Sequence, residues 1–253
     1  MNLKIALVQL RITHGNPADN LARMDGFIAE AAAKGAQLVV FPEDAVTGPL
    51  SAQIAHLASA PMFLSECQAL AVKHRVDLVP GTWVVAEPTG LHNVAHYIAS
   101  DGSVLGSYRK INLWPTEQAQ LTPGAAVSVF PTAHGMVGLC ICWDLSFAPL
   151  FAQMKAQGAQ LVISPTYWSF TRPAPQVETV EDGEIALIDS LCLTRAFEHG
   201  LAFAYCNAAG DLKAEGLDAV LSGRSQVTHP LEKVLVRAEG NDECVLVTTV
   251  RID

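Results

Sequence analysis

The sequence predicts an α/β domain in which β-sheets are covered by helices, and two observations carry this prediction. Apolar runs rich in β-branched residues recur along the chain with turn residues after them, and segments of helical periodicity lie between some of them. Strands that are apolar at consecutive positions are buried on both faces, which favours a layered arrangement. Because no repeat, low-complexity tract or clear linker interrupts residues 1–253, we expect a single domain.

The apolar runs predict strands from the first residues to the last. The opening MNLKIALVQL has no long apolar segment followed by small residues, so it predicts a first strand and not a signal peptide. The predicted strands are Lys4–Leu10, Gln37–Phe41, Val76–Val85, Val94–Ser100, Val104–Ile111, Met136–Trp143, Gln160–Ser164, Leu201–Asn207, Lys233–Ala238 and Val245–Ile252.

Helical periodicity places apolar residues on one face of three segments, each of which ends beside a glycine. The irregular span Thr171–Gly183, TRPAPQVETVEDG, is rich in proline and then acidic, which predicts a surface loop or a loop beside the active site. The predicted helices are Asn20–Lys34, Ala148–Gln157 and Glu184–Glu198.

Composition excludes several classes of protein. The net charge of −9, with no cluster of Lys or Arg, argues against nucleic acid as a partner. No apolar run approaches the roughly 18–20 residues that span a bilayer, so no membrane association is expected. Six cysteines without a close-set framework are typical of reduced thiols in a cytoplasmic protein. The motifs of P-loop NTPases, dinucleotide sites and serine α/β-hydrolases are absent.

A metal site is not expected from the histidines or cysteines. His92 and His96 lie four residues apart in a predicted strand, where this spacing means only that they share a face. Cys140 and Cys142 lack the spacing of a zinc knuckle and have no matching His or Cys pair elsewhere.

Three polar residues lie at the ends of apolar strands, where burial of a polar side chain is costly. Glu43 ends QLVVFPE, Lys110 ends VLGSYRK, and Cys142 ends MVGLCIC. Strand ends of layered α/β sheets form ligand crevices, so a carboxylate, an ammonium and a thiol meet in one pocket if these strands are neighbours. The alternative is a Glu–Lys ion pair at the rim and an inert buried cysteine.

The amino-acid sequences of these segments and of several others resemble those of the nitrilase superfamily of carbon–nitrogen hydrolases. The similar blocks are FPEDAVTG (41–48), YRKINL (108–113), TEQAQLTPG (116–124), GLCICWD (138–144), GAQLVISPTYW (158–168), TRAFEHGLAFAYCNAAG (194–210) and SGRSQVTHPLEKVL (222–235). The resemblance implies a four-layer α-β-β-α sandwich that assembles as a homodimer or larger homo-oligomer.

The resemblance also implies a Glu–Lys–Cys catalytic set. Carried over by motif, Glu43 is the base, Lys110 stabilises the oxyanion, Cys142 is the nucleophile, and Glu117 is a second glutamate that positions the substrate. Glu43 would take the Cys142 proton, and the thiolate would attack a carboxamide carbon. The oxyanion would be held by Lys110 and the Trp143 backbone N–H. Ammonia would leave and water would hydrolyse the thioester, with no cofactor and no metal.

Position in the strand distinguishes the two neighbouring cysteines. Cys140 and Cys142 would face the same way in one strand, so the face alone does not choose between them. Cys142 lies at the exit of the strand, where a turn exposes the sulfur and leaves backbone N–H groups available. We therefore expect Cys142 to be the nucleophile and Cys140 to be packing.

The chain departs from the family pattern after the nucleophile. Ser146 and Pro149 stand where many amidase-type members have arginine and glutamate, and Arg224 stands where many have histidine. Substrate selection is expected in the loops after Glu43, around Glu117 and after Trp168. Candidate substrate-binding residues are Tyr167, Trp168 and Arg172, whose guanidinium could hold a substrate carboxylate or could simply be solvated.

The sequence therefore predicts a thiol hydrolase that converts a small linear carboxamide to its carboxylic acid and ammonia. The same residues also fit hydrolysis of an N-carbamoyl compound or of a nitrile, because these rivals differ in the shape of the pocket. A rival of another class is a binding or scaffold protein that kept the fold and lost turnover.

Overall fold

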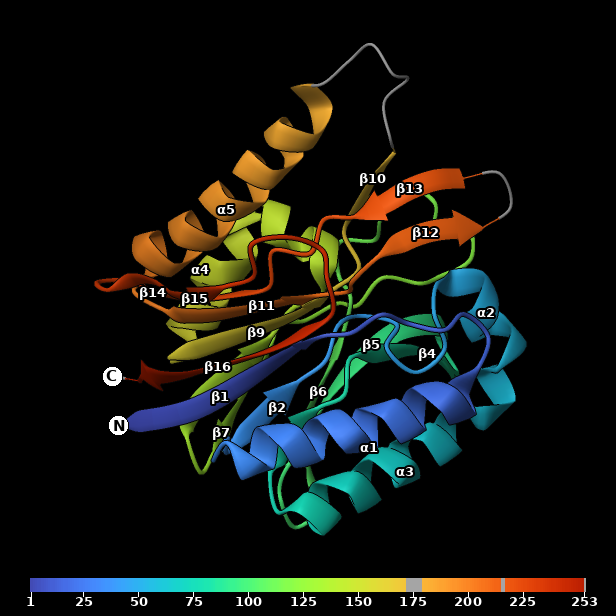
Figure 1. Cartoon of the computed structure of the whole chain (residues 1–253), viewed down its shortest axis with the longest axis horizontal. Coiled ribbons are helices and arrows are strands. Elements are labelled where there is room, and N and C mark those ends of the chain that lie inside the picture. Colours follow the sequence, from blue (N-terminus) through green and yellow to red (C-terminus); the bar gives the residue numbers. More distant parts are fainter. Residues whose placement is uncertain (172–178, 215–216, 253) are drawn as a thin grey trace.

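The computed structural model describes residues 1–171, 179–214 and 217–252, and in them two large sheets pack face to face between two pairs of helices (Figure 1). This order of layers confirms the α-β-β-α sandwich expected from the sequence. The helices are α1 (Pro17–Ala33), α2 (Leu50–Ala55), α3 (Ala60–His74), α4 (Ala148–Ala156) and α5 (Thr179–His199), with short 3₁₀ helices η1 (Leu57–Ser59) and η2 (Cys142–Ser146).

The first sheet has the strand order β16-β1-β2-β3-β5-β4, and β6 pairs with β5. Its parallel centre is formed by β1, β2 and β3, and β16 adds to it antiparallel, so the last strand lies beside the first. The strands are β1 (Asn2–Gln9), β2 (Leu38–Val40), β3 (Asp77–Val79), β4 (Thr82–Glu87), β5 (Gly90–Ile98), β6 (Val104–Arg109) and β16 (Cys244–Arg251).

The second sheet has the order β15-β14-β11-β9-β8-β7, with β8, β9 and β11 parallel. Its strands are β7 (Ser128–Thr132), β8 (Gly135–Leu139), β9 (Leu161–Thr166), β11 (Ala202–Asn207), β14 (Gln226–His229) and β15 (Lys233–Arg237). A smaller sheet, β10-β13-β12, contains β10 (Ser169–Thr171), β12 (Asp211–Ala214) and β13 (Leu217–Leu221).

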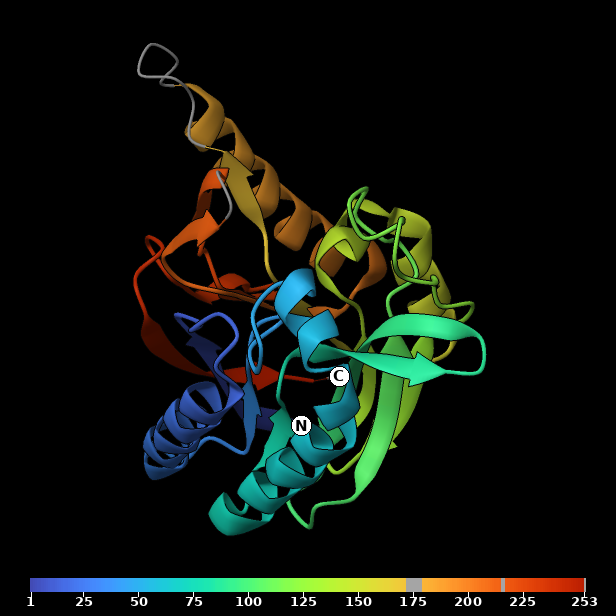
Figure 2. The ribbon, with the colours of Figure 1, turned by 90° about the vertical axis from the view of Figure 1, so that its right-hand side faces the viewer.

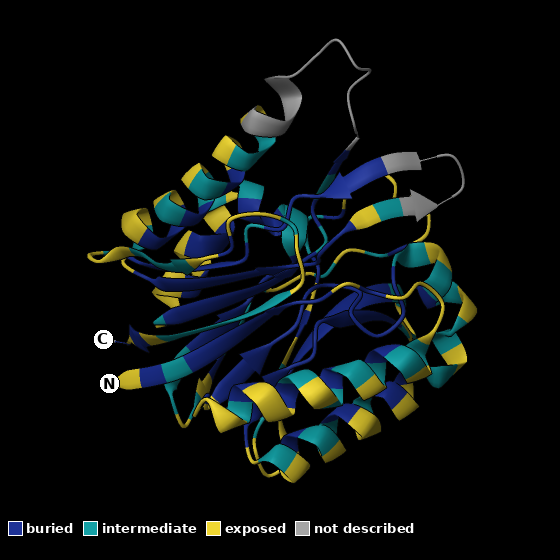
Figure 3. Cartoon of the chain, viewed as in Figure 1, coloured by how far each residue is buried: buried dark blue, intermediate teal, exposed yellow. Residues whose placement is uncertain are grey.

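Side-chain alternation explains why β1 is apolar at consecutive positions. In β1, Leu3, Ile5 and Leu7 belong to the core between the two sheets, whereas Ala6 and Val8 belong to the core under α1 and α3. All five are fully buried, because both faces of the strand are covered. Figure 3 shows the consequence: the central strands of both sheets are mostly dark, whereas the helices carry exposed residues along their outer faces.

The helices cover the sheets with narrow apolar stripes. Met24 and Ile28 of α1 pack on the first sheet, and Phe151 and Met154 of α4 pack on the second. Both ends of the chain lie side by side in two perpendicular views (Figures 1 and 2), and the Met1 ammonium donates to the carbonyl of Ile252 at 2.7 Å.

Several strand and helix boundaries differ from those expected. The run predicted as one strand over Val76–Val85 is two strands, β3 and β4, because Pro80 lacks a backbone donor and Gly81 turns the chain with φ +87°. The first helix begins at Pro17, where the Asn16 side chain caps it. The loop expected over Thr171–Gly183 is wrong at both ends, because Thr171 belongs to β10 and α5 begins at Thr179, and residues 172–178 lie outside the described residues. A further difference, at Cys142, concerns the site.

Chain direction brings the ends of three strands to one place. The strand β2 is parallel to β3, β5 is antiparallel to β3, and β6 is antiparallel to β5. The C-terminal ends of β2 and β6 therefore lie on the same side of the first sheet. In the second sheet β8 and β9 run parallel and also end together. The strand ends of the two sheets are joined by a hydrogen bond of 3.0 Å from the Tyr167 N–H, after β9, to Glu43, after β2.

Candidate active site

Glu43 lies in a loop whose backbone is held by close packing. The loop follows β2, and the turn between β3 and β4 lies against it. A Cβ atom at Gly81 would come within 2.0 Å of the Pro42 carbonyl oxygen, so only glycine permits this approach. The position of Glu43 is therefore fixed by a neighbouring turn as well as by its own strand.

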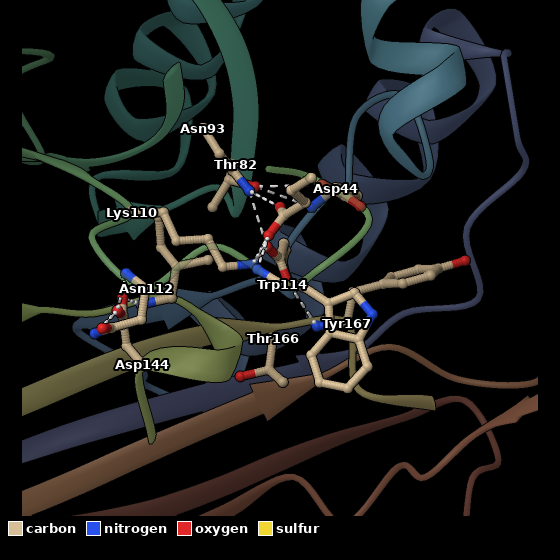
Figure 4. A network of polar contacts seen from close by, with 12 residues as sticks. Asp44, Thr82, Asn93, Lys110, Asn112, Trp114, Asp144, Thr166 and Tyr167 are labelled. Atoms are coloured by element: carbon tan, nitrogen blue, oxygen red, sulfur yellow. Dashed lines mark hydrogen bonds and ion pairs between the residues drawn. The ribbon is translucent and has the colours of Figure 1, made fainter. Parts of the chain in front are cut away.

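The Glu43 carboxylate is buried and has a partner on each oxygen, and Figure 4 labels these partners, Asn93, Lys110 and Tyr167. Oε1 accepts from Lys110 Nζ at 2.9 Å and from Asn93 Nδ2 at 2.9 Å, and Oε2 accepts from the Tyr167 backbone N–H at 3.0 Å. Only 3% of Glu43 is exposed. Three elements of the two sheets thus meet on one carboxylate.

Lys110 joins two glutamates. Its Nζ lies 2.9 Å from Glu43 Oε1 and 2.8 Å from Glu117 Oε2, with 2% of the lysine side chain exposed. Glu117 is held in turn by the Trp114 backbone N–H at 2.7 Å and by Asn93 Nδ2 at 3.3 Å. The backbone of Lys110 bonds to Asn93 and Gly124, so the ammonium is positioned at both ends.

Burial and charge act in opposite directions on this pair. Burial raises the pKa of Glu43, although Lys110 opposes the rise, and the neighbouring Cys142 thiol also opposes it by hydrogen bonding. Burial alone would lower the pKa of Lys110. The negative charges of Glu43 and Glu117, and that of Cys142 when it is ionised, outweigh that effect and raise the pKa of Lys110 well above its ordinary value. The lysine is therefore a permanent cation beside a carboxylate that can take up a proton.

Cys142 is half-buried and begins η2. Its φ of 47° lies in the left-handed region, which is uncommon for residues other than glycine and is concentrated at functional sites. Burial raises the pKa of the thiol well above its ordinary value, and the Glu43 charge adds to the rise, whereas Lys110 and the Tyr167 N–H oppose it. The resting sulfur is a thiol that needs a base.

The expected strand over Met136–Trp143 is wrong at its end. The strand β8 stops at Leu139, and the left-handed turn at Cys142 separates this residue from Cys140. The argument that both cysteines share a strand face therefore does not apply. Cys140 is fully buried, and burial raises the pKa of its thiol far above the ordinary value.

Three buried polar residues of the site region were missed from the sequence. Asn93 lies inside β5, where alternation gives no sign that it contacts two glutamates. Asp44 has a positive φ and accepts hydrogen bonds from the side chains of Thr82 and Gln53. Asp144 is fully buried beyond Cys142. A charged residue next to a predicted catalytic residue was the available signal for both aspartates.

Aromatic rings surround Trp143, the residue that follows Cys142. The Trp143 ring centroid is 4.6 Å from that of Trp114, 5.4 Å from that of Trp168 and 6.2 Å from that of Phe147. Trp168 is buried, and 45% of Trp114 is exposed, so the row runs from the interior to the surface.

The other candidate substrate-binding residues have different surroundings. Besides the backbone contact to Glu43, Tyr167 has its hydroxyl 2.9 Å from His14 Nε2. Trp168 donates from its indole nitrogen to Glu184 at 3.1 Å. Arg172 lies outside the residues that the structure describes.

The departures from the family pattern have separate surroundings. Ser146 ends η2, and Pro149 occupies the first turn of α4, where its missing N–H has no helical partner to lose. Arg224 forms an ion pair with Asp189 of α5, which also accepts from Gln226 at 3.0 Å. Arg224 therefore ties the segment before β14 to α5.

Residues 1–171, 179–214 and 217–252 contain neither a metal-binding cluster nor a membrane-spanning helix. No group of three or more His, Cys, Asp and Glu side chains is arranged to hold a metal ion there. No helix in this part of the chain is long and apolar enough to cross a membrane.

Known proteins similar to this chain include amidases and a glutamine-dependent synthetase. The human omega-amidase NIT2 is 30% identical over 98% of this chain and 88% of its own length. The glutamine-dependent NAD(+) synthetase of Xylella fastidiosa is 32% identical over 90% of this chain but only 42% of its own length. The crystal structure of an amidase from Nesterenkonia sp. aligns over 98% of this chain and 90% of its own, with 28% identity and a TM-score of 0.82.

The family model of carbon-nitrogen hydrolases matches residues 4–253. The match thus covers all three strand ends that hold Glu43, Lys110 and Cys142. The chain belongs to the carbon–nitrogen hydrolase family of the nitrilase superfamily and is an amide-hydrolysing enzyme of the amidase-like kind.

Proposed function

We propose that the protein hydrolyses a small linear carboxamide to the carboxylic acid and ammonia through a thioester on Cys142. In this proposal Glu43 is the general base, Lys110 stabilises the oxyanion, and Glu117 positions the substrate. The observation that carries the proposal is the Lys110 ammonium, which lies between Glu43 and Glu117 at 2.9 and 2.8 Å beside the Cys142 thiol.

The first half of the reaction forms the thioester. The Glu43 carboxylate takes the thiol proton, and the Cys142 sulfur forms a bond to the carboxamide carbon. The carbonyl π electrons move to oxygen, where the Lys110 ammonium and the Trp143 N–H stabilise the negative charge. The C–N bond then breaks, and Glu43 gives its proton to the leaving nitrogen, which departs as ammonia.

The second half regenerates the enzyme. A water molecule gives a proton to Glu43 and attacks the thioester carbon, and the oxyanion again lies beside Lys110. The C–S bond breaks, the sulfur recovers the proton, and the carboxylic acid leaves. The raised pKa of Glu43 supports this double role, because the group must accept a proton and return it in each half.

The test is release of ammonia from a panel of substrates. The panel contains acetamide, butyramide, carboxamides with a second carboxylate, nitriles and N-carbamoyl amino acids. We expect ammonia from one or more amides, loss of that activity in Cys142→Ala, and activity retained in Cys140→Ala. Cys140 is the matched control, because it is a buried cysteine two residues away.

The rivals predict different products. Ammonia from nitriles alone would favour a nitrile hydrolase, and ammonia with carbon dioxide from carbamoyl compounds alone would favour a carbamoyl hydrolase. No product from any member of the panel, with Cys142→Ala behaving as the native protein does, would favour the scaffold.

We further propose that the enzyme is a homodimer or a larger homo-oligomer in a reducing, cytoplasmic compartment. Two of its most exposed apolar side chains, Phe197 of α5 and Leu231 between β14 and β15, support self-association, since 67% and 70% of them are exposed. Light scattering of the native protein and a Phe197→Asp, Leu231→Asp variant tests this, and a native monomer would contradict it. All six cysteines are free, which supports the reducing compartment.

A further inference from the structure

Asp144 has four hydrogen-bond donors on its buried carboxylate. Oδ1 accepts from the Asn112 backbone N–H at 2.9 Å and from Asn112 Nδ2 at 2.8 Å. Oδ2 accepts from the Ile141 backbone N–H at 2.9 Å and from the Tyr108 hydroxyl at 2.8 Å. Each oxygen therefore has two donors, and the side chain is fully buried.

These four donors come from the two segments that carry Lys110 and Cys142. Tyr108 and Asn112 lie two residues before and two residues after Lys110. Ile141 directly precedes Cys142. Figure 4 shows Asn112 and Asp144 joined near the start of the Lys110 side chain, on the side away from Asp44. One carboxylate thus connects the end of β6 in the first sheet to the turn after β8 in the second.

The same carboxylate holds the backbone turn of the nucleophile. The Asp144 N–H donates to the Ile141 carbonyl at 3.0 Å while its side chain accepts from the Ile141 N–H. Both bonds span Cys142, whose left-handed φ of 47° needs support from its surroundings. The turn is closed by Asp144 on both of its sides.

The chemistry of the donors requires a carboxylate and not an amide. Two donors are backbone N–H groups, which cannot accept. The Tyr108 hydroxyl already accepts from the Ile111 N–H at 3.1 Å and so donates its own proton to Asp144. An asparagine at this position would place an NH₂ group against a backbone N–H whichever way it is turned, and a buried donor would lose its partner.

We propose that Asp144 is a positioning residue that sets the place of Cys142 relative to Lys110. The proposal rests on the proposed function, in which these two groups act on one carbonyl. Asp144 itself touches neither the thiol nor the ammonium in the described contacts. Its effect is on the geometry of attack, where a displacement of about 1 Å can cost about 10²-fold in rate.

The test is Asp144→Asn, compared with Asp77→Asn as the matched control. Asp77 is also a buried aspartate that accepts from a tyrosine hydroxyl, Tyr97 at 2.6 Å, and from a backbone N–H, Ser100 at 2.9 Å. It lies at the start of β3, whereas Glu43 follows the end of the neighbouring parallel strand β2, so the two residues lie at opposite ends of these strands. Both variants lose comparable buried hydrogen bonds, but only one of them lies at the site.

Two readouts are measured on each folded variant at pH 7.5. For Asp144→Asn we expect kcat to fall about 10- to 100-fold with KM within about 3-fold of the native value. We expect the rate of Cys142 alkylation by iodoacetamide to fall about 10-fold. For Asp77→Asn we expect a lower melting temperature with kcat and the alkylation rate within about 2-fold of native.

The outcomes separate a positioning role from a structural one. Equal losses of kcat in both variants, or unchanged alkylation in Asp144→Asn, would overturn the proposal. Alkylation needs no amide substrate, so it still tests Asp144 if no amide is turned over and the proposed function fails. If Asp144→Asn does not fold, Tyr108→Phe removes one donor and keeps the carboxylate. It must then slow alkylation by a smaller factor, and no change would again overturn the proposal.

Discussion

Lys110 Nζ and Glu43 Oε1 are 2.9 Å apart, and less than 5% of either side chain is exposed. A buried ion pair of this kind gains little stability over an apolar pair, because removing both charges from water is unfavourable. Leaving one charge without its partner is much worse. The pair is therefore expected to be sensitive to single substitutions in both stability and catalysis.

The substitution Lys110→Met should lower both the stability and the catalytic activity of the protein. The substitution leaves Glu43 and Glu117 facing each other in a buried site, which should cost about 3–5 kcal/mol in the free energy of unfolding. Loss of the oxyanion cation should lower kcat by at least about 10²-fold. Urea unfolding and ammonia release measure the two effects.

The neighbouring residue provides the control for that substitution. Arg109 pairs with Glu87 at 2.7 Å, with 46% of the arginine side chain exposed. Because water screens exposed pairs, Arg109→Met should change the free energy of unfolding by about 1 kcal/mol or less and leave kcat within about 2-fold. Equal effects of the two substitutions would contradict the role of burial.

The pH dependence of kcat/KM should show an acid limb set by Glu43. The base acts in its ionised form, so the rate falls as the pH falls through the pKa of Glu43, which burial raises above 4.5. The raised pKa of Cys142 keeps its sulfur protonated at neutral pH, so no thiolate titration contributes to that limb. Initial rates between pH 4 and 9 measure the limb, and a midpoint at or below 4.5 is the contrary result.

Relative to the native protein, the Asp44→Asn variant should gain stability as the pH rises. Burial and the Glu43 charge raise the pKa of Asp44 well above 3.8, so the folded protein holds this proton more tightly than the unfolded chain does. The contribution of Asp44 therefore favours folding at acidic pH and is lost as the pH rises through the raised pKa. The variant removes this loss, and urea midpoints at acidic and neutral pH measure it.

Asp101→Asn is the control of opposite sign. Hydrogen bonds from Ser103 lower the pKa of Asp101, so its contribution to stability is present above 3.8 and is lost as the pH falls. This variant should be less stable than native at neutral pH and equal to it in acid. A shift of the same sign in both variants would rule out the explanation for Asp44.

Trp114→Ala should raise KM for amides with long apolar acyl groups. The centroid of the Trp114 ring lies 4.6 Å from that of Trp143, which follows the proposed nucleophile, and 45% of Trp114 is exposed. Loss of one aromatic contact corresponds to about 0.5–1.5 kcal/mol, or about 2- to 10-fold in KM. Acetamide should be affected less than butyramide. Met62→Ala, an exposed apolar residue of α3, should change neither, and an equal effect on both amides would contradict an acyl-binding role.

The layers of the fold could be predicted from the sequence because burial on both faces leaves an unbroken apolar pattern. Internal breaks were harder to predict. Val76–Val85 is apolar on both sides of Pro80 and Gly81, and only the turn at this pair divides it into two strands. The strand β7 contains Pro131, and a proline is tolerated there because β7 lies at the sheet edge, which the sequence does not reveal.

The positions of Glu43, Lys110 and Cys142 were predictable because polar residues at the ends of apolar strands are uncommon, and their proposed roles came from the resemblance to the nitrilase superfamily. Their geometry was not predictable. The left-handed turn at Cys142 occurs without glycine and is supported by Asp144, which is two residues away in sequence and also contacts Asn112. Asn93 contacts Glu43 across about fifty residues of chain, a pairing that strand register creates and local pattern cannot show.

The central claim is a covalent acyl group on Cys142, and mass spectrometry of acid-quenched turnover mixtures tests it most directly. With butyramide, native enzyme and Cys140→Ala should both carry the mass of the amide minus ammonia on the peptide that contains residue 142. The modification should be absent in Cys142→Ala, which should also release no ammonia. Ammonia release without an acyl group on Cys142, or with one on another residue, would contradict the account.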